Sequence, residues 1–102
     1  MNVLLSEKFS QKWDVYFEYC VMNYGSVVAK KKYNALLKII QRLSVFPEIG
    51  FLEPLLKGGK KNYFAIVFDK KRKIIYSIEK DKIVIENLWD MRQDPKKMKN
   101  DF

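Results

Sequence analysis

The chain has 102 residues, of which 48% are hydrophobic and 15% aromatic, enough for one folded domain and too few for two cores. Its 20 Lys and Arg against 12 Asp and Glu give a net charge of +8, which favours acidic or polyanionic partners such as RNA, DNA, a ribosome or an acidic protein. The single Cys20 excludes an internal disulfide, and the absence of histidine removes the commonest general acid–base group.

These counts also limit the kinds of site. No Asp/Glu cluster has the spacing of a metal site, so we expect no metal and no cofactor. No apolar run approaches the length of a membrane span, and the N-terminus lacks the pattern of a signal peptide. The sequence therefore predicts one domain over residues 1–102 that has no membrane contact and is cytoplasmic.

The first half of the chain predicts a short strand and two helices. Residues 1–5 are apolar and typical of a strand, and Ser6 can cap the helix that follows. Gly25 and Ser26 end that helix and begin a second one, which stops before Pro47. The apolar stripe of the first helix is Phe9, Trp13, Tyr16, Phe17 and Cys20. So short a connection predicts an antiparallel helical hairpin.

The second half predicts strands. The runs NYFAIVFD, KIIYSIE and KIVIENLWD are rich in Ile, Val, Tyr and Phe, and polar turns at 69–72 and 80–81 predict antiparallel pairing. Alternation places Ile83, Ile85 and Trp89 on one face. We expect an α+β fold in which the helical hairpin covers a small antiparallel sheet. Residues 1–5 could join an edge of this sheet, and a polar, basic tail begins at about residue 96.

Basic residues interleaved with aromatic ones occupy the second half of the chain. Cations near exposed rings hold single-stranded RNA through phosphate contacts and base stacking. Each lysine alone is better explained as a solvated turn residue, but together they could form one electrostatic field. The candidate nucleic-acid-binding residues are Lys57, Lys60, Lys61, Tyr63, Arg72, Lys96 and Lys97.

The order of two helices, PEIGFLEPLLKG, three strands with KIIYSIE, and a closing LWDMRQDP resembles the RelE/ParE superfamily of small bacterial toxins over about residues 2–96. The resemblance implies the toxin of a type II toxin–antitoxin system, with a cognate acidic antitoxin in a hetero-oligomeric complex. It also implies one of two targets. RelE-like and YoeB-like members are mRNA interferases that cut mRNA on the ribosome without a metal, whereas ParE-like members inhibit DNA gyrase.

The nuclease residues of that superfamily carry over in part. Glu53, in an E-P-L segment, matches the general base of YoeB-like members. Lys73 stands where that branch has an arginine, three residues before the strand tyrosine, and Arg92 matches the late arginine. Asp94 and Pro95 replace the C-terminal His-Tyr pair. An aspartate ordinarily ionises well below pH 7, so it is a poor acid for the leaving 5′-oxygen, and proline has no donor.

The resemblance leaves three interpretations open. The first is a ribosome-dependent endoribonuclease with Glu53 as base and Lys61, Lys73 and Arg92 as phosphate stabilisers. The second is a ParE-like inhibitor of DNA gyrase that acts by contact and has no chemistry of its own. The third is a decayed toxin that binds only its antitoxin. The basic sheet and Glu53 favour the first, whereas the missing acid and the lysine at residue 73 favour the second.

Overall fold

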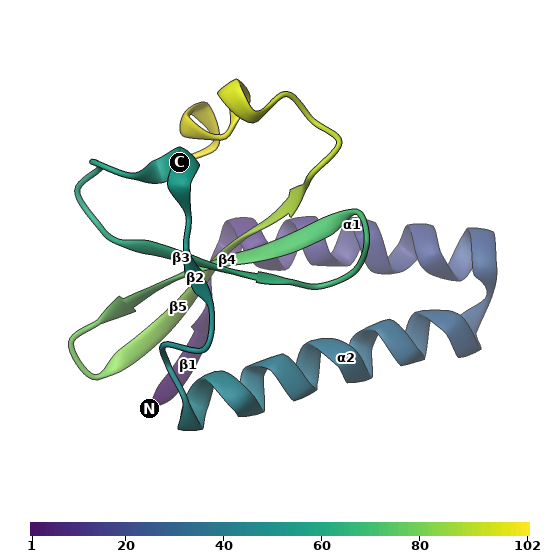
Figure 1. Ribbon diagram of the computed structural model, residues 1–102. Coiled ribbons are helices and arrows are strands. Elements are labelled where there is room, and N and C mark those ends of the chain that lie inside the picture. Colours follow the sequence, from purple (N-terminus) through teal and green to yellow (C-terminus); the bar gives the residue numbers. More distant parts are fainter.

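The computed structural model describes all residues, Met1–Phe102, as two helices and a five-stranded sheet (Figure 1). The helices are α1 (Glu7–Tyr24) and α2 (Ser26–Val45). The strands are β1 (Asn2–Leu5), β2 (Phe51–Leu52), β3 (Tyr63–Val67), β4 (Arg72–Glu79) and β5 (Lys82–Asp90). Three short 3-10 turns are η1 (Pro54–Leu56), η2 (Pro95–Lys97) and η3 (Lys99–Asp101). Neither helix combines the length and the apolar character needed to cross a membrane.

The helical hairpin begins and turns where the sequence predicts. The Ser6 hydroxyl oxygen accepts a hydrogen bond of 3.0 Å from the backbone N–H of Phe9, which satisfies a free donor in the first turn of α1. Gly25 has φ = +88° and donates its N–H to the Val21 carbonyl at 3.0 Å. Residues that carry a side chain rarely adopt this backbone conformation, so a glycine here allows α2 to start immediately and fold back along α1 (Figure 1).

The sheet is mixed and has the order β1-β5-β4-β3-β2. Strands β3, β4 and β5 pair antiparallel as predicted, and β1 lies at an edge, where it runs parallel to β5. The whole helical hairpin separates β1 from the other strands, so no tight turn forces antiparallel pairing. Strand β2 is an addition at the opposite edge and, with two residues, is too short for an alternation pattern.

A bulge in β5 changes which residues share a face. The register between β4 and β5 shifts by one residue beside Tyr76, which leaves Glu86 as an extra residue in β5. Ile83 and Ile85 therefore pack beneath the helices, whereas Trp89 lies on the other side of the sheet. The prediction that these three residues share a face is wrong, because the extra residue reverses the alternation.

The sheet is covered on both faces. The helical hairpin covers one, where twelve buried residues form the main core: Phe9, Trp13, Tyr16, Cys20, Ala29, Leu36, Leu43, Ile74, Tyr76, Ile83, Ile85 and Leu88. The second cluster contains Leu56, Ala65, Ile75, Trp89 and Met98. Met98 is fully buried, so the segment expected to be a polar tail packs as part of the protein. Figure 1 shows this yellow C-terminal segment beside the teal segment that follows β2.

Tyr76 ties the chain after α2 to the sheet. Its buried hydroxyl accepts a hydrogen bond of 3.0 Å from the Gly50 N–H and donates one of 2.9 Å to the Pro47 carbonyl. Its ring stacks on Phe64 with centroids 5.5 Å apart. The segment that leads into β2 is thus held by one hydroxyl group.

We expect Tyr76→Phe to lower the free energy of unfolding by ~1–3 kcal/mol, because it leaves backbone groups without their partner. Tyr33→Phe is the matched control, since the Tyr33 side chain is 44% exposed and its loss of a hydroxyl should cost under ~0.5 kcal/mol. Urea unfolding of both variants measures the difference. Equal stability of the two would contradict this role of the hydroxyl.

Candidate functional site

Glu53 and Lys73, two of the residues expected at a nuclease centre, form a buried ion pair. Glu53 follows β2 and is only 2% exposed. Its Oε2 accepts a hydrogen bond of 3.0 Å from the Leu55 N–H, which caps the turn η1. Its Oε1 contacts the Nζ of Lys73, whose side chain is 12% exposed. Both oxygens of the expected general base are therefore engaged within the protein.

This pair crosses the sheet. Lys73 lies in β4, opposite Trp89 of β5, while Glu53 lies beyond β3 at the β2 edge. The ammonium of Lys73 therefore fixes the position of η1 above the sheet face that also holds Trp89 and Met98. The carboxylate would have to leave this ammonium before it could accept a proton from a substrate.

Arg92, the third expected catalytic residue, is held elsewhere. Its Nε and Nη2 donate to the Asp90 carboxylate at 3.0 and 2.6 Å, and its backbone N–H donates to the same group at 2.9 Å. The side-chain hydrogen bond from Arg92 is the main cause that lowers the pKa of Asp90 to about 2. Arg92 lines a cavity to which neither Glu53 nor Lys73 contributes, so the structure does not gather the three residues.

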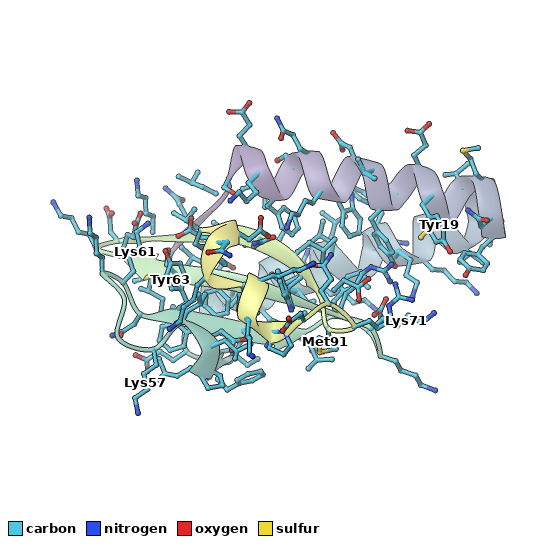
Figure 2. All side chains as sticks on the ribbon, turned by 90° about the horizontal axis from the view of Figure 1, so that it is seen from above. Tyr19, Lys57, Lys61, Tyr63, Lys71 and Met91 are labelled. Atoms are coloured by element: carbon cyan, nitrogen blue, oxygen red, sulfur yellow. The ribbon has the colours of Figure 1, made fainter.

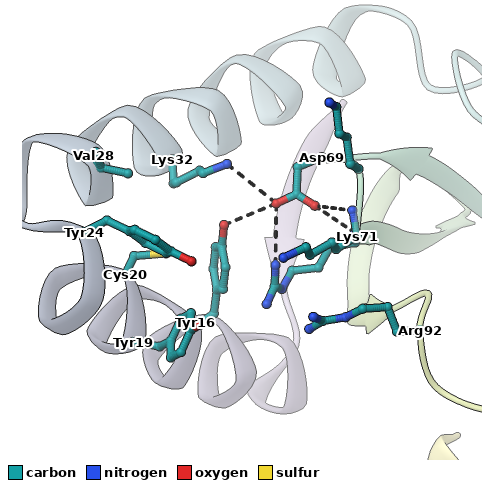
Figure 3. Close-up of a pocket in the computed structure, with 11 residues that line it drawn as sticks. Tyr16, Tyr19, Cys20, Tyr24, Val28, Lys32, Asp69, Lys71 and Arg92 are labelled. Carbon is teal, nitrogen blue, oxygen red and sulfur yellow. Dashed lines mark hydrogen bonds and ion pairs between the residues drawn. The ribbon is translucent and has the colours of Figure 1, made fainter.

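That cavity, the hairpin pocket, is lined by Tyr16, Tyr19, Cys20, Tyr24, Val28, Lys32, Asp69, Lys70, Lys71, Arg72 and Arg92. It has a volume of about 440 Å³ and lies between the helical hairpin, the β3–β4 turn and Arg92, two residues after the end of β5 (Figure 3). Tyr19 and Tyr24 project from α1 beside it and are 48% and 57% exposed. Five cationic side chains line it against a single carboxylate.

Asp69 organises the hairpin pocket. Its Oδ1 accepts the backbone N–H groups of Lys71 and Arg72, each at 2.8 Å. Its Oδ2 lies 3.6 Å from both the Lys32 ammonium and the Arg72 guanidinium, and accepts a longer hydrogen bond of 3.4 Å from the Tyr16 hydroxyl (Figure 3). The Arg72 guanidinium lies 4.3 Å from the centre of the Tyr16 ring. Burial alone would raise the pKa of Asp69, but the two backbone hydrogen bonds and the charges of Arg72 and Lys32 lower it.

Sequence reasoning missed this pocket because its parts come from four segments. Tyr19 and Tyr24 fall outside the apolar stripe of α1, and the sequence indicates only that Lys70 and Lys71 belong to a turn. The sequence does contain two tyrosines that lie outside the apolar stripe of this helix, and a basic turn between two strands. That the two lie side by side can be inferred only once the register of the sheet is known.

The predicted nucleic-acid-binding residues do not line one pocket. Lys57, Lys61 and Tyr63 line a second pocket of about 320 Å³ next to Glu53. Arg72 instead belongs to the hairpin pocket. Figure 2 shows Lys57, Lys61 and Tyr63 toward one end of the molecule and Tyr19 and Lys71 toward the other.

Most of this set is solvent-exposed or already paired. Lys61 lies 2.7 Å from Glu79 and 3.2 Å from Glu86, and the hydrogen bond to Glu79 is the main cause that raises its pKa. The Tyr63 ring packs against Phe102 with centroids 4.8 Å apart.

The remaining lysines of the set, Lys60, Lys96 and Lys97, are exposed. The last two lie in η2, where Asp94 caps the turn by accepting the Lys96 N–H at 3.0 Å. No three His, Cys, Asp or Glu side chains are arranged to hold a metal.

Glu53→Gln should lower the free energy of unfolding by ~3–5 kcal/mol, because it leaves the charge of Lys73 largely buried without its partner. The double variant with Glu53→Gln and Lys73→Met removes both charges and should recover much of that loss. Urea unfolding of the parent, both single variants and the double variant completes the cycle. Additive losses would show that the two side chains do not depend on each other.

Comparisons with known proteins agree with this fold. A family model described as the ParE toxin of the type II toxin–antitoxin system parDE matches residues 3–95. A chain of the chromosomal ParDE system from P. aeruginosa has a TM-score of 0.70 and 13% identity, with 88% of this chain and 95% of that chain covered. A YoeB/ParE toxin from Agrobacterium tumefaciens has a TM-score of 0.62 and 13% identity, with 88% and 98% covered.

No match was found among curated proteins. The two structural likenesses, at 13% identity, bear on the fold alone. The family model covers nearly the whole of the region that forms the helical hairpin and the sheet. On that match, the chain belongs to the ParE family of toxins of type II toxin–antitoxin systems.

Proposed function

We propose that this toxin arrests growth by binding DNA gyrase and not by cleaving mRNA. The observation that carries the proposal is the buried pair of Glu53 and Lys73. It joins the expected general base to one of the expected phosphate-binding cations inside the protein. ParE-like members of the superfamily inhibit gyrase, and inhibition by contact needs a binding surface but no free base.

Metal-free RNA cleavage requires three kinds of group that this structure does not bring together. The reaction needs a base that reaches the 2′-OH, cations at the phosphorane and an acid for the leaving oxygen. Glu53 already accepts a backbone N–H and faces an ammonium, and Arg92 lies in a different cavity. Assembling a nuclease centre from these residues would require breaking the buried pair, and breaking such pairs is costly.

Ribosome-dependent mRNA cleavage remains the second candidate, and one observation favours it. Glu53 borders the same pocket as Lys57, Lys61 and Tyr63, so a carboxylate, two cations and a ring lie together. This combination of groups suits the backbone and base of a single-stranded RNA. On this hypothesis, contact with the ribosome supplies the proton donor that the chain lacks.

Two assays with the purified toxin test the target. The proposal predicts inhibition of gyrase-driven plasmid supercoiling and no new cleavage of ribosome-bound mRNA by primer extension. If the nuclease hypothesis holds instead, the parent cleaves mRNA, Arg92→Ala lowers cleavage on the order of a hundredfold through loss of a positioned charge, and Asp94→His raises it by supplying an acid.

Lys82→Ala is the control for charge, because Lys82 is exposed and lies in neither pocket. Strong mRNA cleavage by the parent that Arg92→Ala abolishes, with supercoiling unaffected, would overturn the gyrase proposal. Supercoiling that falls with added toxin while the mRNA remains intact in all variants would support it.

Membership of this family implies a cognate antitoxin. We infer that the antitoxin is acidic and that an apolar segment of it covers the β2 edge. The outer side of β2 has no strand partner, and the surrounding apolar side chains are unusually exposed. They are Val45, Phe46, Ile49, Phe51, Leu52 and Val67. The net charge of +8 would steer an acidic partner, while these residues would supply the apolar anchors.

Leu52→Glu should weaken antitoxin binding by about tenfold or more, because Leu52 is 62% exposed at the proposed anchor site and a charge there would be buried by the partner. Val15→Glu is the matched control, since Val15 is 71% exposed on α1. Surface-binding kinetics with the cognate antitoxin measure both variants. Equal losses in the two variants would argue against the β2 edge as the binding site.

A further inference from the structure

We propose that the hairpin pocket binds a nucleoside phosphate, with the base against Tyr19 and Tyr24 and the phosphate between Lys71 and Arg92. This inference goes beyond the gyrase proposal and does not depend on it. The pocket, at about 440 Å³, has the size of a small-ligand site. Its two sides differ in chemistry, with aromatic rings from α1 on one and cations from the β3–β4 turn and the end of β5 on the other (Figure 3).

The aromatic side is open to a ligand. The Tyr19 and Tyr24 rings meet edge to face with centroids 6.1 Å apart, and about half of each side chain is exposed. Exposed rings at such an angle leave a face free for stacking. Because every nucleobase has a face that can stack on tyrosine, such rings bind a base independently of its identity.

The cationic side of the pocket carries more positive charge than its carboxylate neutralises. Asp69 is the single carboxylate of the pocket, and it already faces Lys32 and Arg72. Neither Lys70 nor Lys71 has a carboxylate within ion-pair distance in the structure, and both are exposed. Arg92 uses Nε and Nη2 for Asp90, so its Nη1 is free to donate. The Arg92 guanidinium, held by Asp90, thus presents a donor that is oriented before a ligand arrives, and Lys70 and Lys71 add positive charge beside it.

A phosphate fits this balance better than the carboxylates of an acidic peptide. A phosphate monoester carries about −1.5 to −2 charges near neutral pH and offers three acceptor oxygens, whereas each carboxylate carries one charge. An extended peptide would also need unpaired backbone groups, such as those along a free strand edge. The pocket is walled by helices and a tight turn, and the edge strands of the sheet, β1 and β2, do not line it.

Titrations of the full-length toxin, followed by NMR shifts of the pocket residues, test the proposal. The probes are 5′-AMP, adenosine, inorganic phosphate, a short 5′-phosphorylated oligothymidylate and a glutamate-rich peptide. We expect saturable shifts with 5′-AMP and binding about tenfold weaker for adenosine or phosphate alone. Lys71→Ala and Tyr24→Ala should each weaken 5′-AMP binding by about tenfold, as removal of a stacking ring or phosphate cation does.

Matched variants separate the pocket from general charge and shape. Lys82→Ala removes the same charge outside the pocket, and Tyr24→Phe keeps the ring, so both should bind 5′-AMP as the parent does. An oligonucleotide that binds about tenfold more tightly than 5′-AMP identifies a nucleic-acid strand as the source of the nucleotide. Equal or weaker binding identifies a free nucleotide. Either result supports the site.

Three outcomes would overturn the proposal. The first is the absence of saturable binding by both 5′-AMP and the oligonucleotide. The second is binding that neither Lys71→Ala nor Tyr24→Ala weakens. The third is a peptide that shifts the pocket residues while both nucleotide probes leave them unchanged. Because the titration contains neither gyrase nor ribosome, failure here leaves the target assays unaffected.

Discussion

The buried ion pair between Glu53 and Lys73 constrains both the fold at the β2 edge and the chemistry available there. It connects the segment after the edge strand β2 with β4, so it holds η1 against the sheet face opposite the helices. Leu56 of η1 then packs in the same cluster as Trp89 and Met98. A buried pair of this kind contributes little net stability over apolar residues of the same volume, but loss of one partner is costly. Because separating the two side chains is costly, the ion pair restricts the chemistry that Glu53 and Lys73 can perform.

Lysine suits this position for a geometric reason. Its ammonium is a compact point charge that can face one carboxylate oxygen, which leaves the other oxygen for the Leu55 N–H. An arginine would present a planar fork with several donors, and the donors that Glu53 did not satisfy would need further acceptors or solvent. The lysine that stands in place of the arginine of YoeB-like toxins thus suits the internal pair, and this pair supports the proposed action by contact.

The sequence predicts those features that depend on local chemistry. Ser6 sets the start of α1 through a cap, and Gly25 sets its end through a positive φ. Both bounds can be predicted from the sequence because each residue acts on its neighbours in the chain. The turns between β3, β4 and β5 are likewise local. The bulge at Glu86 is not, because it depends on how two strands pair, and it places Trp89 on the face opposite to that predicted. For the same reason, the burial of Met98 could not be read from the polar residues around it.

The candidate sites follow the same division. The superfamily resemblance identified Glu53, Lys73 and Arg92 by their order in the chain, but order does not reveal which side chains neutralise each other. Asp90 follows Trp89 in β5 and takes the guanidinium of Arg92, while Asp69 in the β3–β4 turn takes that of Arg72. The charge of +8 is therefore unevenly available for binding. Lys70 and Lys71 stay free of carboxylates beside two exposed tyrosines, and this local excess of charge, more than the total, gives the hairpin pocket its capacity for an anion.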